Sequence, residues 1–392
     1  MIIEKLPTDL KIILGEIESL GFTLTLVGGT PRDFIFRDVL GHDLDFELRA
    51  NTFIEKKSWP TYYQKLLSFL KNKNISFTEL PYLITRFDLG NFKCEFSSPR
   101  LEINKEDDFS HHHFEADLDS NLDYYSSFKR RDFTINAIGI ELNLKEDRDK
   151  IIDPFEGIRD LEHGLLKNIS SDFFFDAVRF LRLIRFQIKF DRFVIDEKLY
   201  SRLGEFNLSK LSKHHFIEEI FKSNPGMFFN LFSKIVKDQK LEIPSEFSVW
   251  TKFTYPENLH SKEEILGFVF FQNVKYAQDV SRFFSLPEKK LRDLISFYKS
   301  YEVIHECTKD DFLKILTEVK EEGLKDPLLK ELKNLEDKKE WLELLHFPKK
   351  ELIISWEDWE KIKLDTNELN LLDAPLRSFL IYYKAIEVKL KK

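Results

Sequence analysis

The stretch LTLVGGTPRDFIFRDVLGHDLDFELR, residues 24–49, organises the rest of the chain. Residues 24–27 form a short apolar run, which predicts a buried strand. Gly28-Gly29 ends that strand with a turn in which the backbone can approach a ligand closely. Residues 33–40 have helical character, and Gly41-His42 marks a second turn. The stretch therefore predicts a strand, a glycine turn and a short helix before a second strand begins.

That second strand, residues 43–48, alternates acidic and apolar side chains. On a strand, Asp43, Asp45 and Glu47 project from one face, while the apolar residues between them pack behind it. Two carboxylates two residues apart repel each other unless a positive charge lies between them. A divalent cation such as magnesium suits hard oxygen ligands. The glycine turn and Arg32 upstream favour this interpretation over the alternative, a solvated polar face.

Length and composition restrict the class of protein. The chain has 392 residues, enough for two or three domains. It contains no apolar run of about eighteen residues and begins without the features of a signal peptide. Its two distant cysteines, Cys94 and Cys307, favour a reducing cytoplasm. The net charge of −8 argues against indiscriminate nucleic-acid binding, although a local basic stripe would still suffice for RNA phosphates.

A third carboxylate lies on another predicted strand, residues 92–96. If that strand neighbours the one with the aspartates, Glu95 would complete a cluster with Asp43 and Asp45. The alternative is an ordinary surface glutamate.

Residues 104–129 are polar and rich in turn formers, which predicts a long loop. Within it, His111, His112 and His113 are adjacent, so they cannot all face one ion on regular structure. We interpret them as loop surface, with metal binding as the alternative.

The run RRDFTINA, residues 130–137, places paired arginines next to an aspartate. Arginines suit a phosphate and an aspartate suits a sugar hydroxyl. The alternative is an ordinary helix start that Asp132 caps.

From about Asp172 onward the chain is predicted to be helical. Four charged residues share a broad face of the first helix, residues 173–190: Asp176, Arg179, Arg182 and Arg185. An aspartate and an arginine held side by side present an acceptor and donors that can read the edge of a nucleobase. A weak ion pair on a solvated face is the alternative.

Taken in order, these motifs resemble the class II tRNA nucleotidyltransferase and bacterial poly(A) polymerase family over roughly residues 20–200. The resemblance is carried by four segments: GGTPRD (28–33), DLD (43–45), RRDFTINA (130–137) and DPFEGIRDL (153–161). It implies an α+β fold, in which an N-terminal nucleotidyltransferase head with a mixed β-sheet is followed by an all-helical neck, body and tail. The implied boundaries are residues 1–165 for the head, 166–225 for the neck and 226–392 for the body and tail.

The resemblance also implies roles for individual residues. Asp43 and Asp45 would hold two magnesium ions, with Glu95 as a third catalytic carboxylate. The remaining site residues would bind the nucleotide: Gly28, Gly29, Arg32 and Arg131 at the triphosphate, Asp132 at the ribose, Asp176 and Arg179 at the base, and Arg182 at a further contact.

The implied function is template-independent addition of C and A from CTP and ATP to tRNA 3′ ends in the cytoplasm. One departure bears on specificity, because Phe175 stands where the family usually has a glutamate before the Asp-x-x-Arg motif. The alternative is therefore an adenylate-only or relaxed enzyme of the poly(A) polymerase type. A second alternative is an inactive RNA-binding relative. The segment 211–216 also departs from the family, and the oligomeric state is not predicted.

Overall fold

The computed structural model describes residues 1–104, 114–319, 324–325, 330, 333, 353–362 and 369–390. It divides into two compact units, one made of residues 1–219 and 238–242 and the other of residues 220–237 and 243–392. The three-part division into head, neck and body remains a prediction. The three adjacent histidines lie outside the described residues.

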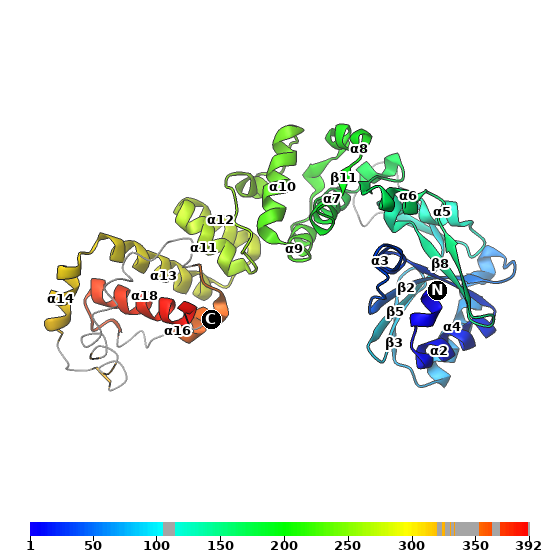
Figure 1. Cartoon of the computed structure of the whole chain (residues 1–392), viewed down its shortest axis with the longest axis horizontal. Coiled ribbons are helices and arrows are strands. Elements are labelled where there is room, and N and C mark those ends of the chain that lie inside the picture. The colour runs from blue at the N-terminus through cyan, green and yellow to red at the C-terminus, as the bar shows by residue number, and fades with distance from the viewer. Residues whose placement is uncertain are drawn as a thin grey trace. The chain divides into compact units, whose positions relative to one another are not determined.

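The first unit is built on a seven-stranded sheet with the order β3-β4-β5-β2-β1-β8-β9 (Figure 1). Its central strands β2 and β5 are parallel, whereas the other neighbours in the sheet are antiparallel. The predicted α+β class with a mixed sheet is therefore confirmed. The strands are β1 (Phe22–Val27), β2 (Asp43–Ala50), β3 (Phe77–Leu80), β4 (Ile84–Leu89), β5 (Phe92–Ser97), β8 (Gly139–Asn143) and β9 (Arg148–Ile152).

One face of the sheet is covered by α2 (Thr8–Ser19) and α4 (Trp59–Asn72), which share a core with it. Leu44, Phe46 and Leu48 of β2 are fully buried in that core, as their alternation predicted. Burying each such side chain contributes roughly 1.5–3 kcal/mol, so a register slip that exposed them would be strongly disfavoured. The register of β2 consequently directs Asp43, Asp45 and Glu47 to the opposite face.

The helix after the glycine turn begins earlier than predicted. It is α3, Gly29–Arg37, instead of residues 33–40. Gly28 adopts φ of 80° and turns the strand directly into the helix, while Asp38, at φ of 55°, ends it in the left-handed region. The predicted loop 104–129 is also partly wrong, because β6 (Arg100–Asn104) and β7 (Phe114–Leu118) pair there and α5 (Tyr124–Phe128) follows.

The helix that carries the arginines is α7, Ala177–Lys189. It begins later than predicted because a 3-10 turn, η3 (Ser171–Phe175), precedes it and Asp176 caps its first turn. The buried side of α7 is apolar and includes Phe180, Leu181 and Ile184. A short parallel pair, β10 (Leu165–Leu166) with β11 (Val194–Ile195), flanks it, so this region is not entirely helical.

Further elements of the first unit include α1 (Ile2–Lys5), η2 (Thr134–Asn136), α6 (Gly157–Glu162), α8 (Glu197–Ser201) and most of α9 (Lys213–Phe221).

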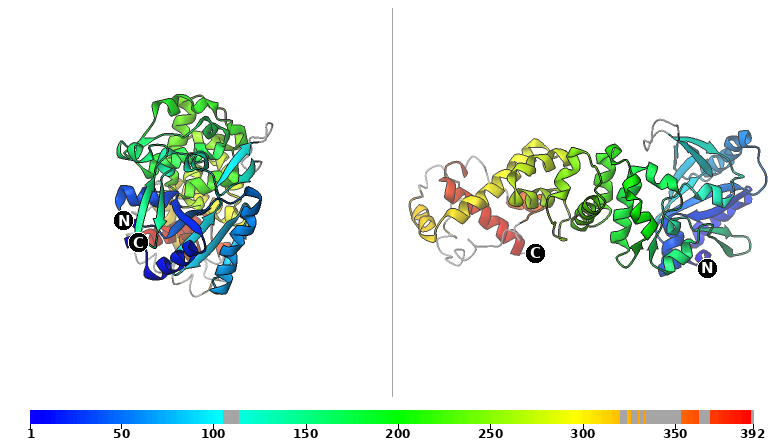
Figure 2. Two further views of the ribbon diagram at one scale, coloured as in Figure 1. Left: turned by 90° about the vertical axis from the view of Figure 1, so that its right-hand side faces the viewer. Right: turned by 90° about the horizontal axis from the view of Figure 1, so that it is seen from above.

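The second unit is helical in its described part, as predicted. Its longer helices are α10 (Pro225–Asp238), α11 (Lys262–Gln272), α12 (Val274–Phe284), α13 (Glu288–Glu306), α14 (Lys309–Thr317), α16 (Trp356–Ile362) and α18 (Ala374–Leu390). Helices α13 and α18 pack side by side (Figure 2). Stacked aromatic rings fill part of its core, with Phe229 and Trp250 at 4.4 Å between ring centroids. None of the described helices is long and apolar enough to cross a membrane.

Helix α6 packs against η2 without room for an added side chain. A Cβ at Gly157 would lie 2.2 Å from the Thr134 carbonyl oxygen, which is backbone and cannot rotate away. We expect Gly157→Ala to lower the free energy of unfolding by about 1–3 kcal/mol, as overpacking does. Urea denaturation checks this. Gly204→Ala is the control, because a Cβ there meets nothing within 4 Å; equal stability of the two variants would contradict the prediction.

Candidate active site

Three carboxylates lie on two adjacent strands of the sheet. Asp43 and Asp45 are two residues apart on β2, and both side chains are exposed to solvent. In the parallel register of β2 and β5, Asp45 lies directly opposite Glu95. The structure thus places Glu95 on the neighbouring strand, as the cluster hypothesis required.

The charges around Asp45 leave it in a negative environment. Desolvation raises the pKa of the Asp45 carboxyl, and the negative charges of Glu95 and Asp43 add to the increase, while Arg131 opposes it. Glu95 is partly neutralised, since its carboxylate accepts a hydrogen bond of 2.5 Å from Arg86 of β4. Arg86 was not predicted as a site residue; its position opposite Glu95 follows from strand pairing alone.

The donor set fits a divalent cation. Asp43 and Asp45 offer exposed oxygen ligands on one face, and mutual repulsion raises the energy of that face until a positive charge is added. Among the described residues, however, no three His, Cys, Asp or Glu side chains are gathered into a ready-made metal site. The two aspartates are therefore the residues that would hold an ion, and Glu95 is instead engaged with Arg86.

The glycine turn lies against Asp45. A Cβ at Gly28 would be 3.1 Å from Asp45 Oδ2 and 3.9 Å from Arg131 Nη1, so a larger residue would crowd both groups. Thr30 Oγ1 donates to the Asp43 carbonyl at 2.8 Å and ties the start of α3 to β2. The N-terminus of α3 presents backbone N–H groups beside this face, an arrangement that favours anions such as phosphate.

Arg32 is buried and fully engaged. It is 3% exposed and donates to both Asp33 oxygens at 2.8 and 2.9 Å and to Asn136 Oδ1. Its guanidinium carbon also lies 5.3 Å from the ring centroids of Phe186 on α7 and of Phe190, which directly follows that helix. In this structure Arg32 joins α3 to α7; its predicted contact with the triphosphate stays a prediction.

Asp132 is buried in a similar network. Its carboxylate accepts from Arg182 Nε at 2.7 Å, from Asn136 Nδ2 at 2.8 Å and from the Phe133 N–H at 2.8 Å. Desolvation would raise the pKa of this carboxyl, but the Arg182 charge and these hydrogen bonds outweigh it and lower the pKa to about 2. The structure thus brings together two predicted site residues 50 positions apart. The predicted ribose contact of Asp132 remains a prediction.

Asn136 connects the two networks, since it accepts from Arg32 and donates to Asp132. It is 4% exposed, and a buried amide of this kind needs such partners. Asn136 lies within the RRDFTINA motif, but the sequence alone assigned it no role. The signal available there was a polar residue inside an otherwise apolar run.

Asp176 and Arg179 lie next to each other at the start of α7. Asp176 accepts from the Val178 N–H at 2.8 Å and lies 3.9 Å from Arg179 Nε. Arg179 Nη2 also donates to the Arg130 carbonyl at 2.7 Å. This bond attaches the start of α7 to the segment with the paired arginines.

Part of the chain is similar in sequence to known proteins. Residues 24–167 match the family model described as the Poly A polymerase head domain. A CCA-adding enzyme of Ligilactobacillus salivarius is 28% identical over 222 residues, which cover 55% of this chain and 47% of that protein. A CCA-adding enzyme of Limosilactobacillus reuteri is 31% identical over 204 residues, 50% of this chain and 44% of that protein. The chain thus spans about half the length of these curated relatives.

Solved structures extend the likeness of fold to nearly the whole chain. A CCA-adding enzyme in complex with CTP aligns over 93% of this chain and 94% of its own, with a TM-score of 0.55 and 19% identity. A tRNA-processing enzyme in an apo form aligns over 95% and 98%, with a TM-score of 0.53. At this identity the likeness concerns the fold. The family model itself matches residues 24–167, as the Poly A polymerase head domain, in agreement with the resemblance that the sequence motifs indicated.

Proposed function

We propose that the chain is a template-independent RNA nucleotidyltransferase that adds C and A from CTP and ATP to tRNA 3′ ends in the cytoplasm. The observation that carries this proposal is the pair of exposed aspartates, Asp43 and Asp45, beside the glycine turn of a Poly A polymerase head domain. The similarity of half the chain to proteins named CCA-adding enzymes supports tRNA as the substrate.

Asp43 and Asp45 would hold Mg²⁺, with Glu95 close enough to contribute once an ion attracts it away from Arg86. Bound Mg²⁺ would supply Lewis acidity, which lowers the pKa of an RNA 3′-hydroxyl and stabilises charge on the α-phosphate as pyrophosphate leaves. Gly28 and Gly29 would let backbone N–H groups approach the triphosphate, and Arg131 would add positive charge there.

The neck helix would read the base. Asp176 and Arg179 present an acceptor and donors at the start of α7, fixed by the helix cap and by the Arg130 carbonyl. Asp132 would act as the residue that positions Arg182 for its nucleotide contact, because its carboxylate binds Arg182 twice, at 2.6 and 2.7 Å. Protein side chains would thus take the place of a template strand.

A second candidate is an adenylate-only or relaxed enzyme. Phe175 replaces the glutamate usual in the family, and its side chain is 43% exposed directly before Asp176. A neutral ring there removes one acceptor from the group that would discriminate CTP from ATP. An inactive RNA-binding relative is a third candidate, and retention of both aspartates argues against it.

Replacing Asp43 and Asp45 together by Asn is expected to abolish the activity. The variant keeps the shape of both side chains but loses the negative charge that would hold the ions, so nucleotide incorporation should fall at least about 100-fold. Incorporation of labelled nucleotide into tRNA at saturating Mg²⁺ measures this. Asp9→Asn is the control, because Asp9 is exposed on α2 at the opposite face of the sheet. A double variant that retained incorporation would refute the proposed site.

The product identifies the enzyme class. With a tRNA that ends at its discriminator base, we expect CTP alone to give two added nucleotides and CTP with ATP to give three, ending in CCA. Sequencing the extended 3′ ends checks this. Extension by ATP alone into a longer tail would instead support the adenylate-only candidate, and no extension of any RNA would support the inactive one.

The buried Asp132 carboxylate should make stability depend on pH. Its folded pKa of about 2 lies below the ordinary value, so its contribution is complete above the ordinary pKa and is lost as pH falls toward the folded pKa. The lowered pKa of Asp132 corresponds to a contribution of about 2 kcal/mol to the free energy of unfolding at pH 7. About half of this contribution is lost by pH 3. Urea denaturation of wild type and Asp132→Asn at both pH values measures it.

In that experiment the stability difference between wild type and variant should shrink at pH 3. Gly204→Ala changes no titrating group, so the difference in its free energy of unfolding from that of wild type should not change with pH. A difference for Asp132→Asn that stayed constant from pH 7 to pH 3 would contradict the assignment.

A further inference from the structure

Asn136 lies between two buried side chains of opposite hydrogen-bonding character. Arg32 on one side can only donate hydrogen bonds, whereas the ionised Asp132 on the other side can only accept them. A side chain that bonds to both must present an acceptor to Arg32 and a donor to Asp132. Asn136 does so, because its Oδ1 accepts from Arg32 Nη1 and its Nδ2 donates to Asp132 Oδ1 at 2.8 Å. A leucine there would make neither bond, and an aspartate would turn a second acceptor toward Asp132.

The backbone that carries this amide is held in place. Asn136 ends the 3-10 turn η2, and its N–H donates to the Phe133 carbonyl at 2.9 Å. Thr134 attaches the same turn to α6, because its hydroxyl donates to Asp160 Oδ2 at 2.7 Å. The side chains of Thr134, Asn136 and Asp160 are all buried, so water does not compete for these bonds. The position of the amide is therefore set by the fold before a nucleotide binds.

Through Asp132 this amide acts on Arg182 of α7. Asp132 Oδ1 accepts from Asn136, while Oδ2 accepts from Arg182 Nε at 2.7 Å and lies 2.6 Å from Arg182 Nη2. A carboxylate paired in this way determines the direction of the guanidinium. The Arg182 side chain is still 35% exposed, so Nη1, which makes neither of these two contacts, can meet a nucleotide.

Arg32 connects the same amide to α3, the helix that follows the glycine turn. Asp33 accepts from Arg32 at 2.8 and 2.9 Å and lies 3.3 Å from Lys189 Nζ, at the last residue of α7. The Phe186 ring lies 5.3 Å from the guanidinium carbon of Arg32 and 5.6 Å from that of Arg182. Helices α3 and α7 are thus joined on both sides of this ring, and the Asn136 amide is part of that contact.

We propose that Asn136 is a positioning residue for nucleotide binding, whose amide orients the Asp132 carboxylate and thereby sets the direction in which Arg182 meets the incoming nucleotide. This inference rests on the proposed function, in which Arg182 contacts the nucleotide. Asn136 is itself too deeply buried to reach a ligand, so its effect passes through Asp132. An arginine without a fixed partner samples many rotamers, and ordering it on binding lowers the affinity.

A double-mutant cycle tests whether Asn136 acts through Arg182. The measurement is the binding of CTP and of ATP to the full chain by isothermal titration calorimetry, with Mg²⁺ and without RNA. Asn136→Ala removes both amide bonds, so both dissociation constants should rise at least about tenfold. In an Arg182→Gln background the same change should alter them by no more than about twofold, because the guanidinium that Asn136 positions is already absent.

Asn143→Ala is the matched control. Asn143 is also a hydrogen-bonded asparagine of the first unit, since its Oδ1 accepts from the Glu146 N–H at 3.0 Å, and its loss should leave both dissociation constants unchanged in either background. Urea denaturation establishes that each variant is folded. If Asn136→Ala does not fold, Asn136→Asp keeps the volume and the acceptor for Arg32 but loses the donor to Asp132, and the same dependence on Arg182 is expected.

Unchanged binding of CTP and ATP by a folded Asn136 variant would overturn the inference. A loss of equal size in both backgrounds would also overturn it, because a merely structural role of Asn136 gives that result. Failure of the proposed function is recognised separately, as wild-type protein that binds CTP and ATP but extends no RNA. The cycle would then still decide the role of Asn136, because it is measured without RNA.

Discussion

The buried carboxylate of Asp132 is the constraint on which the arrangement of the site depends. A charge removed from water must be paired, and Asp132 is paired by Arg182 of α7 and by Asn136, which in turn accepts from Arg32 of α3. Removing Arg182 would leave the buried Asp132 charge unpaired, and removing Asn136 would leave buried hydrogen bonds of Asp132 and Arg32 unmade. This chain of contacts therefore holds the helix that would read a base against the helix that follows the glycine turn.

In contrast to the paired charge of Asp132, the exposed end of the acidic face of β2 carries an excess of negative charge. Asp43 and Asp45 are exposed to solvent, and the neighbouring Arg86 is engaged with Glu95. Such a surface would attract a hard cation, because Glu95 and Asp43 add negative charge at Asp45 and Arg131 only partly opposes it. Charge is balanced at the inner end of β2 and left unbalanced at the outer end, where chemistry would occur.

The two units differ in the features that bear on function. The first unit contains the matched head domain and the buried networks that fix its polar side chains. The second unit resembles solved tRNA-processing enzymes in fold, and its core consists of packed aromatic rings such as Phe229 and Trp250. Helical packing of this kind stabilises a surface without specifying what binds to it, so the proposed RNA contacts would depend on side chains that the fold does not determine.

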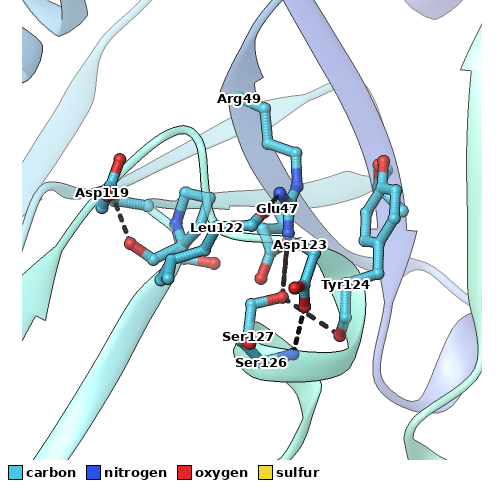
Figure 3. A network of polar contacts seen from close by, with 12 residues as sticks. Glu47, Arg49, Asp119, Leu122, Asp123, Tyr124, Ser126 and Ser127 are labelled. Carbon is cyan, nitrogen blue, oxygen red and sulfur yellow. Dashed lines mark hydrogen bonds and ion pairs between the residues drawn. The ribbon is translucent and has the colours of Figure 1, made fainter. Parts of the chain in front are cut away.

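Local pattern alone was enough to predict β2, its acidic face and the glycine turn, because a period of two residues and a glycine's backbone freedom are properties of neighbouring residues. The motif order likewise indicated the family. Tertiary structure decided that Arg32 is buried, that Asp132 binds Arg182, and that Arg49 of β2 binds Ser127 (Figure 3). Those outcomes depend on pairing and desolvation between segments up to 104 residues apart in the sequence, as for Arg32 and Asn136. A local sequence pattern does not specify contacts between residues so far apart.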